Sequence, residues 1–149
     1  MSSENSSPCV PDRPVEAFFR RFEARSAAVD VEGLVELYAP AFLMAGPGGT
    51  QVVNARDLVY AIPKRKQLFD AAGCRSTMLV SVDETRLDDR YSLVRTEWEW
   101  VFQRADGTAT TISQPSTFVV DRVADGGKIV CYINHGDVVA EMRERGLLR

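Results

Sequence analysis

Four long segments of alternating side chains in the second half of the chain constrain the fold more than any other feature. They cover residues 77–87, 91–104, 109–123 and 128–134, and short polar turns such as Asp106-Gly107 separate them. Asp-Gly between two alternating segments is a strong β-hairpin signal. Consecutive strands joined by tight turns form an antiparallel meander. The second half therefore predicts a sheet of four antiparallel strands.

The first half of the chain is helical in pattern. Residues 14–28 carry apolar side chains at the i, i+3, i+4, i+7 spacing of an amphipathic helix, at Val15, Phe18, Phe19 and Phe22. Asp30 is a capping residue for a second helix that carries Leu34, Val35, Leu37 and Tyr38 and ends at Pro40.

Two short strands at 42–45 and 51–53 follow, and a third helix begins near 54–57 and stops before Gly73. Pro63 predicts a kink or a break inside that helix. A last short helix is expected over 138–145. Helices kept apart from an antiparallel sheet define the α+β class. We expect three N-terminal helices to cover one face of a curled antiparallel sheet, with a conical cavity between the layers.

Composition limits the partners. A chain of 149 residues predicts one domain, here 14–149 after a disordered tail at 1–13. The net charge is −3, and the sequence lacks the basic stripe that a nucleic-acid-binding surface needs. The basic cluster Lys64-Arg65-Lys66 is interpreted as a solvated helix face. No apolar run approaches a membrane span and no signal peptide is visible.

Three cysteines without a CxxC motif favour reduced thiols in the cytoplasm. A single histidine and the lack of a glycine-rich phosphate loop predict no metal and no cofactor.

Alternation assigns the walls of the cavity. On the strand at 91–104, bulky residues occupy the even positions and Glu97 and Glu99 the odd ones. The two carboxylates should therefore face away from the cavity, which argues against an acid/base pair there. The expected ligand contacts are Met44, Tyr60, Trp98, Trp100, Phe102, Gln114 and Phe118. Pro115 could introduce a bulge that shifts the parity at Gln114.

The last strand contains the chain's only histidine near its end. With Ile129 and Ile133 as inward anchors, Cys131 and His135 point inward, while Tyr132 and Asn134 point outward. His135 is then a candidate base at the rim of the cavity. Asp137 suits the cap of the last helix and could also orient the imidazole. Cys131 is interpreted as packing rather than as a nucleophile.

Several segments resemble the nuclear transport factor two-like superfamily, in particular its SnoaL-like and ketosteroid isomerase-like branches. They are Phe18-Phe19-Arg20-Arg21-Phe22, the run from Asp30 to Tyr38 before Pro40 and Phe42, Trp98-Glu99-Trp100, and Thr117 to Arg122 before Gly127-Lys128-Ile129-Val130. The resemblance implies a cone-shaped domain with a ligand pocket. It also implies cofactor-independent isomerase, cyclase or dehydratase chemistry, although the long strands carry no inward-facing acid. Tyr38 would be a hydrogen-bond donor.

Two functions stay open. The first is a pocket for a small hydrophobic molecule, with proton transfer by His135, Asp137 and Tyr38. The second is a non-catalytic scaffold that forms a homodimer through the outer sheet face. That face is expected to carry Arg95, Glu97, Glu99, Thr111, Ser113, Thr117, Tyr132 and Asn134.

Overall fold

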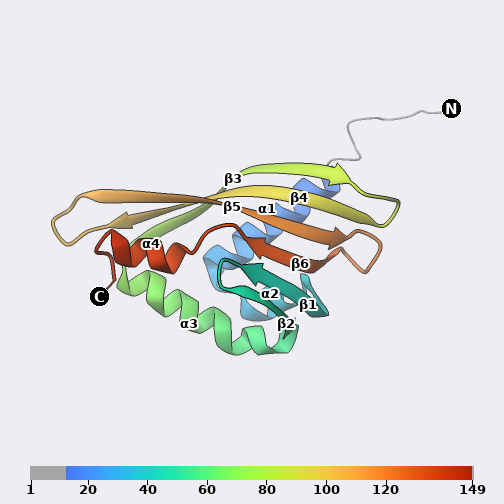
Figure 1. The fold of residues 1–149 in the computed structure, drawn as a ribbon, viewed down its shortest axis with the longest axis horizontal. Coiled ribbons are helices and arrows are strands. Elements are labelled where there is room, and N and C mark those ends of the chain that lie inside the picture. Colours follow the sequence, from blue (N-terminus) through green and yellow to red (C-terminus); the bar gives the residue numbers. More distant parts are fainter. Residues whose placement is uncertain (1–12, 149) are drawn as a thin grey trace.

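The computed structural model describes residues 13–148, which form a curled sheet flanked by helices (Figure 1). In chain order the elements are α1 (Arg13–Ala28), α2 (Val31–Val35), β1 (Tyr38–Gly46), β2 (Gly49–Asn54), the 3-10 turn η3 (Ala55–Asp57), α3 (Leu58–Ala71), β3 (Cys74–Arg86), β4 (Tyr91–Gln103), β5 (Ala109–Asp121), β6 (Lys128–Asn134) and α4 (Val138–Glu144). The predicted α+β class is confirmed.

The six strands form one open sheet in the order β2-β1-β6-β5-β4-β3. The meander from β3 to β6 is antiparallel throughout, as the hairpin signals predicted. The pair β1–β6 is parallel, and the chain reaches it only after the meander has crossed from β3 to β6. This pairing joins segments about ninety residues apart in sequence, so no local turn signal announces it.

Helices α1 and α3 pack on the same face of the sheet. Phe19 of α1 lies 4.8 Å from Phe118 of β5, and Phe22 lies 5.8 Å from Trp98 of β4, both between ring centroids. Phe69 of α3 lies 6.0 Å from Trp100. Burying a side chain of this size contributes about 1.5–3 kcal/mol to folding. These aromatic contacts fix the helical layer over the inner face of the sheet.

The alternation predicted for β4 is confirmed. Trp98, Trp100 and Phe102 are 4%, 7% and 0% exposed and belong to the core. Glu97 and Glu99 pair with Pro115 and Ser113 across the other face of the sheet. The two carboxylates therefore lie outside the core, as predicted.

The alternation predicted for β6 is wrong. Val120 pairs with Ile129 but Val119 pairs with Cys131, so Val130 is an inserted residue in a β-bulge. A bulge reverses the side-chain parity beyond it. Phe118 and Ser116 on the inner face consequently pair with Tyr132 and Asn134. Cys131 and His135 lie on the outer face, and Tyr132 and Asn134 on the inner face, opposite to the prediction.

The second helix has the predicted cap but not the predicted end. Asp30 caps α2 by accepting a hydrogen bond from Gly33 N at 3.0 Å, as expected. The helix ends at Val35, however, and Pro40 lies within β1 at the point where the β1–β6 register shifts. A proline has no N–H to donate to a ladder, which fits that irregularity.

Helix α3 runs unbroken through Pro63, so the expected break is absent. It stops at Gly73, whose φ of +87° and close approach to Gln103 O leave no space for a Cβ. Of the predicted tail, residues 1–12 lie outside the described part of the chain, and Arg13 belongs to α1.

Candidate functional site

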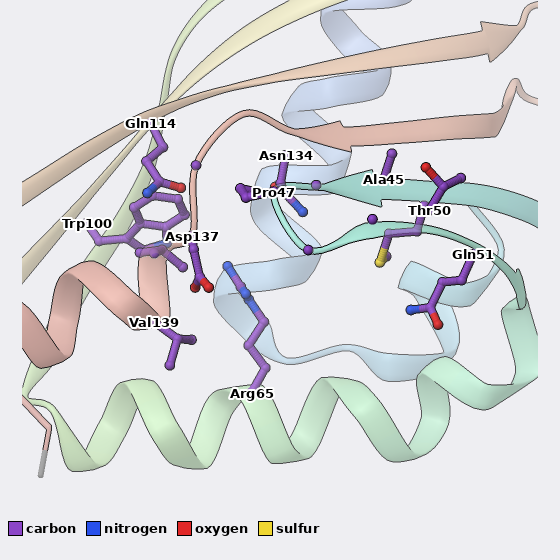
Figure 2. A pocket seen from close by; sticks show the side chains of 16 residues that line it. Ala45, Pro47, Thr50, Gln51, Arg65, Trp100, Gln114, Asn134, Asp137 and Val139 are labelled. Carbon is purple, nitrogen blue, oxygen red and sulfur yellow. The ribbon is translucent and has the colours of Figure 1, made fainter.

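A cavity of about 430 Å³ opens at one end of the sheet, between the β1–β2 hairpin, α3 and the start of α4 (Figure 2). Four strands each deliver an inner-face residue to it: Met44 from β1, Trp100 from β4, Gln114 from β5 and Asn134 from β6. The remaining walls are the hairpin residues 45–51, Arg65 of α3, and residues 136–139. The site is built where the curled sheet ends and the helical layer leaves it uncovered.

Gln114 is the most unusual side chain of the cavity. It is 8% exposed and lines the cavity, yet its amide makes no hydrogen bond with any side chain or backbone group of residues 13–148. A Cβ placed on Gly136 would lie 2.7 Å from Gln114 Nε2, so the amide rests directly on the backbone of the 134–138 turn. Gln114 and Trp100 both line this part of the cavity (Figure 2).

A chain of hydrogen bonds crosses the inner face toward the cavity. Trp98 Nε1 donates to Thr96 Oγ1 at 2.9 Å, and Thr96 Oγ1 donates to Ser116 O at 3.1 Å. Ser116 Oγ donates to Asn134 Oδ1 at 3.2 Å. With its oxygen occupied, Asn134 presents its Nδ2 donor at the cavity wall.

The lining carries one cation and one anion, Arg65 and Asp137. Arg65 projects from α3 into the cavity toward Asp137 (Figure 2). Its guanidinium carbon lies 4.6 Å from the centre of the Phe69 ring, a cation–π contact. Asp137 caps α4 by accepting a hydrogen bond from Ala140 N at 3.0 Å, which confirms the predicted cap.

Two tyrosines lie near Arg65: Tyr38 belongs to the buried core, and Tyr132 is partly buried against that core. Burial raises the pKa of Tyr38 well above its ordinary value, and the neighbouring Tyr132 adds to that rise. Burial likewise raises the pKa of Tyr132, partly offset by the Arg65 guanidinium and by a hydrogen bond with Ser116. Both phenols are therefore neutral donors at physiological pH, and Arg65 is near enough to influence each of them.

The structure brings together only some of the residues proposed from the sequence. Met44, Trp100, Gln114 and Asp137 line the cavity. Tyr38 is a buried core residue that does not line it. Trp98, Phe102 and Phe118 are core residues that do not line it, because α1 and α3 cover them. Tyr60 is 76% exposed on α3 and does not line the cavity either, so the expectation that it reaches the ligand is wrong.

His135 lies on the outer sheet face, away from the cavity. Its Nε2 is 2.6 Å from Thr117 Oγ1, and its backbone N donates to Pro115 O. Thr117 pairs with the exposed Arg95 across strands β5 and β4, so both residues lie on the outer face of the sheet. The prediction that the imidazole reaches the rim of the cavity as a base is wrong, because the bulge at Val130 reverses the faces of the residues that follow it in β6.

Sequence reasoning missed Arg65 and Asn134 as cavity residues. Asn134 was assigned to the outer face because the bulge was not foreseen. For Arg65 a signal existed: it lies on the α3 stripe that includes Leu58, Ile62 and Phe69, at i+7, i+3 and i−4 spacing. Arg65 is itself exposed, which fits a position at the open side of the cavity.

Within residues 13–148, no group of three or more His, Cys, Asp or Glu side chains could hold a metal ion. No helix in the same part of the chain is long and apolar enough to cross a membrane.

These features define a small α+β domain with a curled, open six-stranded sheet and a cavity at one end of that sheet. The profile of the family described as NTF2-like protein (DUF6841) matches residues 12–137. The chain belongs to the NTF2-like family. No curated protein matches the sequence significantly.

Solved structures share the fold at low sequence identity. Aln2 from a Streptomyces species superposes with a TM-score of 0.72 at 13% identity, over 93% of this chain and 99% of that one. An NTF2-like protein with a cystatin-like fold from Novosphingobium aromaticivorans gives 0.69 at 19%, over 93% and 88%. A protein from Catenulispora acidiphila in complex with S-DNPA gives 0.65 at 15%, over 85% and 95%.

Proposed function

We propose that this domain binds a small, partly apolar molecule in the cavity between the β1–β2 hairpin, α3 and α4. Trp100 and Met44 supply apolar surface, and Gln114 supplies the polar contact that orients the ligand. Ligand sites commonly combine an apolar lining with a few polar groups placed in this way.

The observation that carries this proposal is the unpartnered amide of Gln114. Within residues 13–148 only Glu84 Oε1 is a fully buried side-chain atom without a hydrogen-bond partner, so the Gln114 amide is reachable from the cavity and free to bond a ligand. Gln114 is 8% exposed and finds no partner in the described residues. A polar atom of a bound molecule would satisfy the amide, while the flat Trp100 indole beside it would stack on a planar ring.

A similar fold with a bound molecule supports the proposal indirectly. The Catenulispora acidiphila protein was solved in complex with S-DNPA and is 15% identical to this chain. For proton-transfer chemistry of the isomerase, cyclase or dehydratase type, Asp137 is the carboxylate in the lining. It would act as the base in place of His135, since the imidazole lies on the other face.

The test uses 2-naphthamide, a neutral planar probe, in isothermal titration calorimetry. Replacing Gln114 by Leu nearly keeps the volume and removes the amide, so affinity should fall about fivefold, the value of one hydrogen bond. Val123→Ser, an exposed change after β5 and outside the cavity, is the control and should leave affinity unchanged. Equal affinity for wild type and the Leu variant, or failure of both this probe and its carboxylate analogue 2-naphthoate to bind the wild type, would contradict the proposal.

A second candidate role is homodimerisation through the outer sheet face. Leu43, Val52 and Met78 are 39%, 75% and 50% exposed on that face, and Ile133 and Cys131 lie between them in the sheet. Exposed apolar side chains gathered on one sheet face favour a protein partner, and a second copy offers the same surface.

Sedimentation velocity would test this role. The wild type should sediment as a dimer, and Ile133→Glu, which places a charge in the middle of the face, should shift it to monomer. A wild-type protein that stays monomeric at high micromolar concentration would contradict homodimerisation through this face. The two candidate roles are compatible, since the cavity and this face lie on opposite sides of the sheet.

A further inference from the structure

We infer that the cavity selects an anionic ligand, of the planar carboxylate class, and that Arg65 is the residue that binds its charge. The inference rests on the proposed small-molecule function and adds the chemical class of the ligand.

Arg65 has no ionic partner within the described chain. The ion pairs formed by residues 13–148 include six Lys–acid or Arg–acid contacts, and Arg65 takes part in none of them. Its neighbour Lys66 on the same helix pairs with Asp70. The contact that Arg65 makes is with the Phe69 ring, which holds one face of the guanidinium and leaves its N–H edge directed at the cavity.

A guanidinium edge presents parallel donors that match the two oxygens of a carboxylate. The other polar groups nearby reinforce this preference. Asn134 presents an amide N–H₂ because its oxygen accepts from Ser116, and Gln114 presents an unpartnered amide. The Arg65 guanidinium and the Asn134 N–H₂ group thus offer donors to an acceptor-rich, negatively charged group on the ligand.

Asp137 is the one acid that opposes this preference. One of its oxygens is engaged in capping α4. Figure 2 shows its carboxylate facing the Arg65 guanidinium, but the two form none of the ion pairs found within residues 13–148. Because unlike charges attract at this range, Asp137 competes with an anionic ligand for Arg65 and repels that ligand directly. Removing the charge of Asp137 should therefore strengthen anion binding, whereas removing the charge of Arg65 should weaken it.

The experiment compares two probes of the same shape, 2-naphthoate and neutral 2-naphthamide, by isothermal titration calorimetry. Arg65→Met keeps the aliphatic stem over Phe69 and should weaken naphthoate binding at least about tenfold, the value of a charge-assisted hydrogen bond, with less than about a twofold effect on naphthamide. Lys64→Met, an exposed neighbour outside the cavity, is the matched control and should change neither affinity.

Asp137→Asn keeps the helix cap and should strengthen naphthoate binding severalfold, with little effect on naphthamide. The thermal midpoint of each variant reports whether it folds. Equal losses for both probes in Arg65→Met, or weaker naphthoate binding in Asp137→Asn, would overturn the inference and leave the proposed function standing. Absence of binding by both probes to the wild type would overturn the two together.

Discussion

The amide of Gln114 rests on the backbone of Gly136 so closely that a single added methyl group would displace it. A Cβ on Gly136 would lie 2.7 Å from Gln114 Nε2 and 2.9 Å from its Cδ. The glycine of the 134–138 turn thus fixes the amide that we propose as the ligand contact. Gln114 of β5 can contact the backbone of this turn because Gly136 has no side chain.

This contact predicts the effect of Gly136→Ala. The added methyl should push the amide out of its present position and weaken 2-naphthamide binding about fivefold, which is the value of the lost hydrogen bond. Gly48→Ala is a matched control in the same lining, because a Cβ there meets nothing within 4 Å. Calorimetric titration of both variants measures the difference. Equal affinities would show that the position of Gln114 does not matter for binding.

The placement of His135 on the outer face predicts that it has no part in the cavity. His135→Ala should bind both naphthalene probes with wild-type affinity, because the imidazole contacts Thr117 on the other side of the sheet. The measurement is the same titration. A large loss of affinity for either probe would indicate that the imidazole lies in the cavity, and it would contradict the register of β6.

Buried tyrosines predict a loss of stability in alkali. The pKa values of Tyr38 and Tyr132 are raised in the folded state, first of all by burial. Above about pH 10, where an unfolded tyrosine ionises, the unfolded state therefore releases protons that the folded state retains. The free energy of unfolding should fall by up to about 1.4 kcal/mol per pH unit for each such group.

Urea unfolding at a series of pH values from about 9 upward measures this slope. Tyr132→Phe removes one of the two groups and should make the decline shallower. A variant with the wild-type slope would contradict the burial of the Tyr132 hydroxyl in the folded protein.

Asp121 at the far end of β5 predicts an effect in acid. Arg90 donates to both of its oxygens, at 2.9 and 2.8 Å, and this hydrogen bonding is the main cause that lowers the pKa of Asp121. A lowered pKa stabilises the fold above the unfolded value of about 3.9, and the stabilisation disappears as the pH falls below it. The backbone N–H groups of Val123 and Ala124 also bond to this carboxylate.

Asp121→Asn should therefore lower the free energy of unfolding by about 1–3 kcal/mol at neutral pH, and the difference from wild type should shrink below about pH 4. Denaturant melts at the two pH values measure it. Asp89→Asn, an exposed residue in the adjacent turn, is the control. A difference that persists unchanged in strong acid would mean that charge on Asp121 is not the cause.

The sequence predicted those parts of the fold that depend on local chemistry. Alternation placed Trp98, Trp100 and Phe102 inside, and turn residues marked each hairpin of the meander. Asp30 and Asp137 were recognised as caps because their partners lie three residues away. These signals need no knowledge of the tertiary structure.

The site was less predictable because it depends on register between distant segments. One inserted residue, Val130, exchanged the faces of Asn134 and His135, and nothing in a continuous apolar run shows where a bulge will fall. Arg65 is assigned to the cavity only once α3 is seen to cross the open end of the sheet. Met44, Trp100 and Gln114 lie on β1, β4 and β5, away from the bulge of β6, and Asp137 was assigned as a helix cap rather than by strand alternation.

The most direct test of the central claim is heteronuclear NMR of the 149-residue chain during titration with 2-naphthamide. The account predicts that the side-chain amide pair of Gln114 and the indole N–H of Trp100 shift together and saturate at one affinity, while the N–H of Trp98, bonded to Thr96 in the core, moves little. Shifts confined to outer-face residues such as Ile133 and Thr117, with Gln114 unmoved, would contradict it.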